Sequence, residues 1–202
     1  DVQSLFPVFR QFGLTVFAGA VLIPLFSLYG KDGVDIKFKR MIIFFFGFFY
    51  FGLLFGLFPV VRNFQQHNHW LTFALATPWI CDTAAYFGGR FFGKHKFAPS
   101  ISPKKTWEGA ISGVIFSMIS GAVFHFTLLK EENLIFILVI SFLIGTLGQT
   151  GDLVESLMKR GAGVKDSGNL FPGHGGILDR TDSLVVSVAV VFISFLVRSY
   201  VS

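Results

Sequence analysis

Six apolar runs alternate with polar segments along the chain, and each is a candidate membrane helix. They cover residues 12–28, 41–61, 70–87, 110–129, 134–149 and 183–201. About 20 apolar residues cross a bilayer core as a helix, which satisfies every backbone hydrogen bond within the segment. The runs lack the period-two alternation of barrel strands, although the fifth is short. The pattern therefore predicts an all-α, polytopic integral membrane protein with about six transmembrane helices.

The composition agrees with this prediction. Hydrophobic residues make up 52% of the chain, 28 residues are phenylalanine, and only 14% are charged, which lies outside the range of ordinary soluble domains. We expect one transmembrane domain over residues 1–202, with N-terminal packing helices in 1–80. Because the sequence starts at Asp1 without a methionine and carries no cleavable signal, we also expect further spans before it.

Basic residues are concentrated in three of the five loops. Residues 31–40 contain four lysines and arginines, 90–107 contain five and 152–182 contain four, whereas the two intervening loops contain one each. The positive-inside rule therefore places the three basic loops, including 90–108 and 152–182, on the cytoplasmic side. A basic face suits anionic lipid head groups and polyphosphates alike, so the net charge of +5 does not distinguish a substrate site from an anchor.

The third run contains a carboxylate, Asp82, in an otherwise apolar segment. A carboxylate at that depth is costly unless it is paired or faces a polar cavity, so Asp82 is a functional candidate. A structural hydrogen bond or ion pair between helices is the alternative. In the same run, Cys81 is expected to be a small buried residue, and Trp70 at the run's start is expected to lie at the membrane interface.

The segment after the third run presents two adjacent lysines, Lys104 and Lys105, directly after Pro103. Glycine and proline residues at 93, 99 and 103 predict an irregular conformation. Adjacent ammonium groups at a membrane surface suit a phosphate chain, although a flank that only fixes topology would look similar. The fourth run then offers a face of small residues for close helix packing, formed by Gly109, Gly113, Ser117 and Gly121.

A dense polar segment separates the last two apolar runs. Its charged residues include Asp152, Lys159, Arg160, Lys165, Asp166, Asp179, Arg180 and Asp182. Carboxylates are the ligands that Mg²⁺ prefers. Asp152 shares a helix face with Glu155 and Ser156 if the fifth helix continues. Asp179 and Asp182 are three residues apart at the start of the last helix. This spacing suits two metal ligands and a capping pair equally well.

The glycine-rich turn at residues 173–176 adds an anion site to these charges. Its backbone N–H groups can form a nest, with His174 at the edge. Acidic metal ligands, a nest and basic residues together are what phosphoryl or nucleotidyl transfer requires, since catalysis there depends mostly on positioning and charge stabilisation. The segment therefore predicts an enzyme of that kind.

These motifs resemble the signature of the phosphatidate cytidylyltransferase (CDP-diacylglycerol synthase) family. The matching runs are Ser156-Leu-Met-Lys-Arg, Lys165-Asp-Ser-Gly and Phe171-Pro-Gly-His-Gly-Gly-Ile-Leu-Asp-Arg-Thr-Asp182, with further similarity at 82–94 and 102–109. The resemblance implies the conversion of CTP and phosphatidate to CDP-diacylglycerol and pyrophosphate with Mg²⁺, at the inner membrane of bacteria and with the active site on the cytoplasmic side. It also implies a membrane fold with more than six spans.

The resemblance assigns roles to individual residues in the catalytic part, residues 81–202. The implied catalytic residues are Asp152, Lys165, Asp166, Asp179 and Asp182, of which Asp152, Asp179 and Asp182 would hold the metal. The implied substrate-binding residues are Asp82, Lys104, Lys105, Ser156, Lys159, Arg160, His174, Gly175, Gly176 and Arg180. The basic side chains among them would neutralise the phosphates of CTP and of the departing pyrophosphate.

Two alternatives to the cytidylyltransferase stay open at this stage. A CTP-dependent polyprenol or lipid kinase would share the nucleotide but release CDP instead of pyrophosphate. A cation-coupled transporter could use Asp82, Asp152 and Asp179 as an ion path, although the sequence shows no internal repeat. The expected partners are CTP, phosphatidate and membrane lipids, with no nucleic acid. A homodimer, a second cation, the acyl-chain preference and the basis of cytosine selection are left open.

Overall fold

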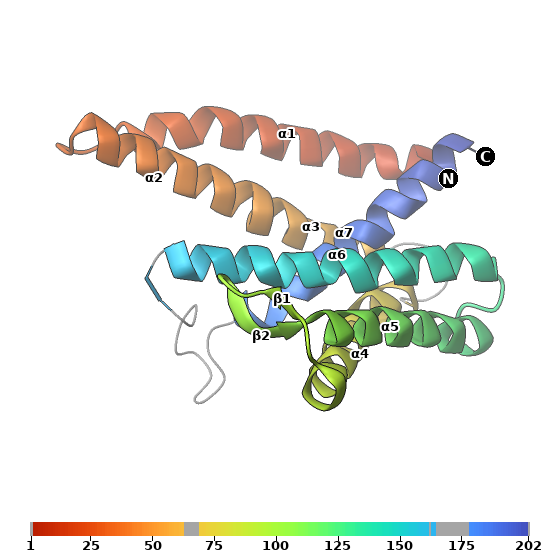
Figure 1. Ribbon diagram of the computed structural model, residues 1–202. Coiled ribbons are helices and arrows are strands. Elements are labelled where there is room, and N and C mark those ends of the chain that lie inside the picture. Colours follow the sequence, from red (N-terminus) through yellow and green to blue (C-terminus); the bar gives the residue numbers. More distant parts are fainter. Residues whose placement is uncertain (1, 63–68, 162, 165–177, 202) are drawn as a thin grey trace.

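The computed structural model describes residues 2–62, 69–161, 163, 164 and 178–201, and the chain is almost entirely helical there (Figure 1). The helices are α1 (Val2–Ser27), α2 (Val34–Phe46), the π-helix η1 (Gly47–Leu53), α3 (Leu54–Arg62), α4 (His69–Phe92), α5 (Trp107–Thr127), α6 (Leu134–Gly161) and α7 (Leu178–Val201). A two-stranded antiparallel hairpin, β1 (Lys96–Ala98) and β2 (Ser102–Thr106), connects α4 to α5. The predicted helical membrane class is confirmed.

Each of the six predicted apolar runs is helical, but they differ in how well they suit a membrane. Four stretches are long and apolar enough to cross one, namely Val34–Arg62, Trp107–Thr127, Leu134–Gly161 and Thr181–Ser199. Gly13–Ser27 is a shorter apolar helix. Helix α4 is not among the four, because Asp82, Arg90 and several small or polar residues dilute its apolar character.

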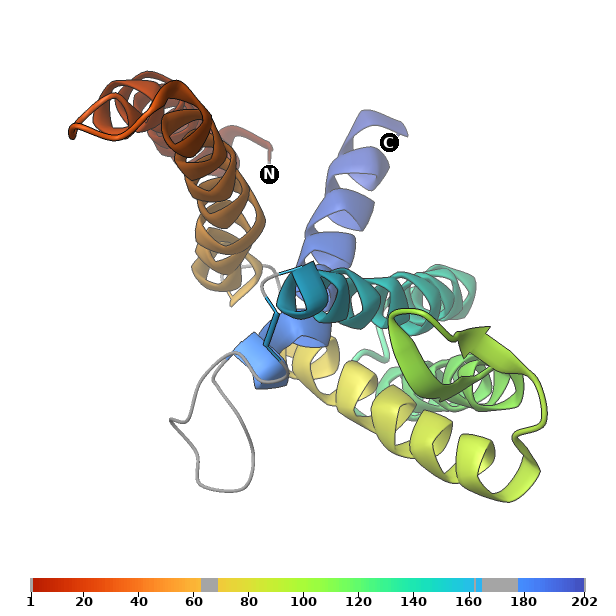
Figure 2. The ribbon, with the colours of Figure 1, turned by 60° about the vertical axis from the view of Figure 1, so that its left-hand side comes forward.

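Helices α4 to α7 form a bundle, while α1 and α2 extend away from it as an antiparallel pair (Figure 1, Figure 2). Helix α3 joins the bundle by packing against α7. The bundle core includes Phe73, Ile137, Ile140 and Val191, which are fully buried. Trp70 is also fully buried, with its ring 4.7 Å from that of Phe195. The prediction of an interfacial Trp70 is therefore wrong, because the start of α4 packs inside the bundle.

Small residues allow α4, α5 and α6 to approach closely. The predicted small-residue face of α5 is buried. A Cβ atom added to Gly113 would lie 2.9 Å from the Sγ of Cys81, and one added to Gly145 would lie 3.1 Å from the Cα of Val114. Ser117 Oγ donates a hydrogen bond to Ser141 O at 2.8 Å. The prediction of close helix packing here is confirmed, as is that of a buried Cys81.

The structure changes the boundaries of both loops that were predicted to be cytoplasmic. Residues predicted to be irregular around Pro103 form the β hairpin, which ends where the Thr106 hydroxyl accepts a hydrogen bond from Gly109 N and caps α5. The segment 152–182 was predicted as a loop, but α6 continues to Gly161 and α7 begins at Leu178. Helix α6 continues because its buried face extends beyond the apolar run through Gly148, Gly151 and Glu155.

An ion pair at one end of the bundle joins α7 to the α5–α6 loop. Glu132 is 7% exposed, and its Oε2 accepts a hydrogen bond from Arg198 Nη1 at 2.5 Å. The Arg198 guanidinium also lies 5.1 Å from the centre of the Phe136 ring. Removing one partner of a pair leaves a buried charge uncompensated, which costs about 3–5 kcal/mol in full burial and less here, because Arg198 is half exposed.

We therefore expect Arg198→Met to lower the midpoint of thermal unfolding in detergent by about 3–8 °C, from about 2–4 °C per kcal/mol for a chain of this size. Arg40→Met is the matched control, because Arg40 pairs with Asp32 where both side chains are accessible. Exposed pairs contribute at most about 1 kcal/mol, so this control should change the midpoint little. Equal shifts in the two variants would contradict a stabilising role for the buried pair.

Candidate active site

A polar cleft of about 520 Å³ lies where α4, the hairpin, α5, α6 and α7 meet. The charged side chains that line it, among the described residues, are Asp82, Arg90, Lys104, Lys105, Asp152, Glu155, Lys159 and Asp182. Acidic and basic groups are thus equal in number. Because these groups come from four separate elements, namely α4, β2, α6 and α7, helix packing brings together residues that lie as much as a hundred positions apart in sequence.

Three carboxylates converge on one side of the cleft. Asp152 and Glu155 come from successive turns of α6, and Asp182 comes from the first turns of α7. Each offers an oxygen within 4.8 Å of the others, and both Glu155 and Asp182 are buried. We call these three residues the acidic cluster. Carboxylate oxygens at such separations fit a hard divalent cation such as Mg²⁺.

Ser183 links Asp82, the fourth carboxylate of the cleft, to the acidic cluster. Its hydroxyl donates to Asp82 Oδ2 at 3.1 Å, and its backbone N–H donates to Asp182 Oδ1 at 2.7 Å. Asp82 on α4 is thus tied to the beginning of α7. The sequence alone left Asp82 as either a site residue or a structural hydrogen-bonding group, and the structure gives it both a place in the cleft and such a bond.

Two lysines pair with the acidic cluster. Lys105 Nζ, from the hairpin, lies 2.6 Å from Asp152 Oδ2, and Lys159 Nζ lies 2.5 Å from Glu155 Oε2 one helical turn away. Lys105 Nζ also donates to Gln149 O at 3.5 Å. These ammonium groups partly neutralise the carboxylates and, being mobile point charges with three donors, can turn toward a phosphate bound in the cleft.

Gln149 fixes the position of α6 beneath the cleft. It is 8% exposed, and its Nε2 donates to Gly145 O at 2.6 Å and to Ala110 O on α5 at 3.1 Å. Buried amides need such partners, so this contact fixes one helix against the other. Sequence reasoning did not single out Gln149. It placed Glu155 on the same face as Asp152, but did not assign it to the metal site.

The structure brings many of the predicted site residues together. Asp82, Lys104, Lys105, Asp152, Lys159 and Asp182 line the cleft. Ser156 lies beside it and donates to Asp152 Oδ1 at 3.3 Å. Arg160 is exposed at the end of α6, where its Nη1 donates to Val164 O at 3.2 Å, and it is not among the lining residues.

The remaining predicted residues cannot be placed as side chains. Asp179 and Arg180 lie in the first turn of α7, where only the backbone is described. Lys165, Asp166, His174, Gly175 and Gly176 are outside the described residues. Their assigned roles stay predictions, including Asp179 as a metal ligand.

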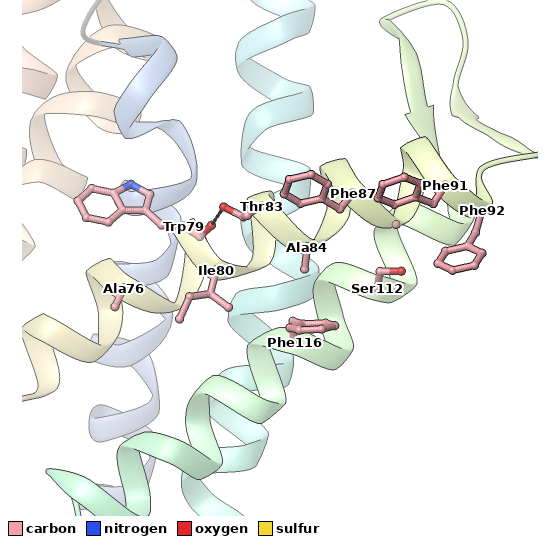
Figure 3. Close-up of a pocket in the computed structure, with 11 residues that line it drawn as sticks. Ala76, Trp79, Ile80, Thr83, Ala84, Phe87, Phe91, Phe92, Ser112 and Phe116 are labelled. Atoms are coloured by element: carbon pink, nitrogen blue, oxygen red, sulfur yellow. Dashed lines mark hydrogen bonds between the residues drawn. The ribbon is translucent and has the colours of Figure 1, made fainter.

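A second, apolar groove of about 570 Å³ runs between α4 and α5 (Figure 3). Aromatic rings of Phe87, Phe91 and Phe116 line it. The hydroxyls of its two polar lining residues, Thr83 and Ser112, each donate to a carbonyl of their own helix at 2.8 Å. The groove presents no charged side chain among the described residues that line it, so the polar cleft is the candidate site for charge chemistry.

The fold and the cleft define a polytopic helical membrane protein whose polar site combines a cluster of three carboxylates with three lysines. The chain belongs to the cytidylyltransferase family, whose model matches residues 2–198. It is 42% identical over 137 residues to a phosphatidate cytidylyltransferase of Bacillus subtilis, with 67% of this chain and 51% of that protein covered. The family resemblance drawn from the motifs is therefore confirmed.

Relatives from other bacteria have the same name. A phosphatidate cytidylyltransferase of Staphylococcus haemolyticus is 46% identical over 136 residues, which cover 67% of this chain and 52% of the relative. One from Haemophilus influenzae is 45% identical over 122 residues, which cover 58% and 42% respectively. The chain spans about half the length of the curated relatives it matches.

Proposed function

We propose that this chain carries the active site of a phosphatidate cytidylyltransferase, which converts CTP and phosphatidate to CDP-diacylglycerol and pyrophosphate. The observation that carries the proposal is the cleft in which the acidic cluster meets Lys104, Lys105 and Lys159. Family membership and the names of the bacterial relatives support this particular reaction. The metal-suited carboxylates and the cations are what nucleotidyl transfer between two polyanions needs.

The proposed division of labour follows from charge and position. Asp152, Glu155 and Asp182 would hold Mg²⁺, with Asp179 as a further predicted ligand. The ion would supply charge neutralisation for the phosphate oxygens. Lys104 and Lys105 approach the cleft from the hairpin, and Lys159 approaches it from α6. We assign these lysines to the CTP phosphates and to the pyrophosphate that leaves.

The reaction itself needs alignment more than proton transfer. A phosphate oxygen of phosphatidate attacks the α-phosphorus of CTP, and a new P–O bond forms in line with the one that breaks. The bond from the α-phosphorus to the bridging oxygen breaks, and pyrophosphate leaves with the electron pair. Because a phosphate monoester is already anionic at neutral pH, no side chain has to remove a proton from it.

We also propose a location for the reaction. The hairpin and the end of α6 carry the basic residues that the positive-inside rule assigns to the cytoplasmic side. The active site would then face the cytoplasm at the inner membrane of a bacterium. A cleft that opens sideways at head-group depth would admit phosphatidate from the bilayer without removing its acyl chains from lipid.

The direct test uses the full-length protein, purified in detergent, with CTP, phosphatidate and Mg²⁺. With CTP labelled at the α-phosphate, label should enter the lipid phase and pyrophosphate should appear in equal amount. Production of CDP together with a phosphorylated lipid would instead identify a CTP-dependent kinase. Folded protein that gives neither product would overturn the proposal and return attention to cation transport.

A further inference from the structure

The hairpin between α4 and α5 delivers Lys104 and Lys105 to the cleft, yet it is too small to hold its shape alone. Strand β1 has three residues and β2 has five, and their register is irregular between Lys96 and Ala98. An isolated two-stranded hairpin is at best marginally stable in water. Contacts to the bundle must therefore fix where the lysines lie.

Glu108, in the first turn of α5, makes the most extensive polar contact with the hairpin among the described residues. Its Oε1 lies 2.6 Å from His95 Nδ1, and its two oxygens accept from His95 N at 3.2 and 3.3 Å. The reciprocal bond runs from Trp107 N to His95 O at 2.9 Å. One carboxylate thus holds both the backbone and the side chain of the residue just before β1.

Packing on either side leaves the hairpin little freedom. The Phe97 and Trp107 rings meet edge to face with centroids 4.5 Å apart. A Cβ atom at Gly93, where the chain leaves α4, would lie 2.1 Å from Gly89 O. On the second strand, Lys105 reaches Asp152 at 2.6 Å. A loss of the Glu108 contact would release the first strand and, through the strand pairing, the second strand that carries the lysines.

We propose that Glu108 is a positioning residue, which holds the hairpin through His95 so that Lys104 and Lys105 face the acidic cluster. The effect of Glu108 on CTP binding rests on the proposed function, whereas its contact with His95 and the hairpin does not. A different role is conceivable from position alone, since a carboxylate in the first turn also stabilises a helix N-terminus by its charge. The two roles make opposite demands on the side chain.

Two substitutions separate these roles. Glu108→Asp keeps the negative charge at the helix N-terminus but shortens the side chain by one methylene, so it loses its reach to His95. Glu108→Gln loses the charge but keeps a carbonyl oxygen that can accept from His95 N and Nδ1. For a positioning residue we expect Glu108→Asp to raise the KM for CTP by about fivefold with kcat changed less than twofold, which is the upper limit for an exposed pair. Glu108→Gln should stay within about twofold of the unmodified enzyme.

His95 provides the complementary pair of variants. Asparagine places an amide N–H near the position of Nδ1, so His95→Asn should retain most of the CTP affinity that His95→Ala loses. Glu131→Asp is the control for the loss of a methylene, because Glu131 is an exposed acid in the α5–α6 loop. It should leave KM and kcat unchanged. A KM that follows charge, with Glu108→Gln impaired and Glu108→Asp normal, would overturn the proposal.

A measurement without substrate distinguishes failure of this inference from failure of the proposed function. In hydrogen–deuterium exchange of the full-length protein, Glu108→Asp should speed amide exchange in residues 95–106 and leave α6 and α7 unchanged. Unchanged exchange in the hairpin would refute the positioning role of Glu108, whatever reaction the protein catalyses. If Glu108→Asp speeds exchange in the hairpin but the unmodified protein transfers no cytidylyl group, the positioning role of Glu108 stands and the proposed function is refuted.

Discussion

Replacement of Asp152 by asparagine is expected to reduce the proposed cytidylyl transfer by about a hundredfold or more, the usual cost of removing one preorganised electrostatic group. Asp152 lies within 4.8 Å of both other carboxylates of the acidic cluster and pairs with Lys105 at 2.6 Å. Asparagine has nearly the same shape and can still accept the hydrogen bond from Ser156, so the helix should fold normally. The measurement is the initial rate with labelled CTP over a range of Mg²⁺ concentrations.

Asp32→Asn is the matched control for Asp152→Asn. Asp32 lies in the loop between α1 and α2, where it pairs with Arg40 on the exposed surface. The same chemical change there should leave both the rate and the Mg²⁺ requirement unchanged. If the Asp152 variant turned over normally with an unaltered Mg²⁺ requirement, the assignment of the acidic cluster to the metal would be wrong.

Glu155 joins the predicted metal ligands because of the structure and not because of the sequence. Helical spacing already places Glu155 on the same face as Asp152, but spacing says nothing about which face of α6 meets α7. That depends on packing, which buries Glu155 at 3% exposure and brings Asp182 close. The metal set chosen from motifs alone therefore named Asp179 and omitted Glu155.

Membrane helices were the most predictable feature. A segment that crosses a bilayer must satisfy its backbone hydrogen bonds internally, so a long apolar run predicts a helix. The β hairpin was not predictable in the same way. Its prolines indicate an irregular segment, and both its strand pairing and the contact between His95 and Glu108 join residues whose proximity the sequence does not reveal. Trp70 shows the same limit, since an aromatic at the start of a run suits an interface as well as a core.

Gly109 lies at the close contact between α4 and α5. We expect Gly109→Ala to lower the midpoint of thermal unfolding in detergent by roughly 5 °C or more. A Cβ atom at Gly109 would lie 2.6 Å from Ala85 O and 3.1 Å from the Gly89 backbone. Backbone atoms cannot turn aside as a flexible side chain can, so the two helices must separate. Overpacking of this kind costs about 1–3 kcal/mol, or about 2–4 °C per kcal/mol in a chain of this size.

Gly56→Ala, in α3, is the matched control, since a Cβ atom there meets nothing within 4 Å in the described part of the chain. Alanine in an open helical position is favoured over glycine by about 0.5–1 kcal/mol, so this variant should unfold at the same or a higher temperature. Helices α4 and α5 also form one wall of the cleft, through Asp82 and Ala110. Their separation should therefore reduce the proposed cytidylyl transfer even below the unfolding temperature. A Gly109→Ala protein as stable and active as the Gly56→Ala protein would contradict the close contact on which the cleft depends.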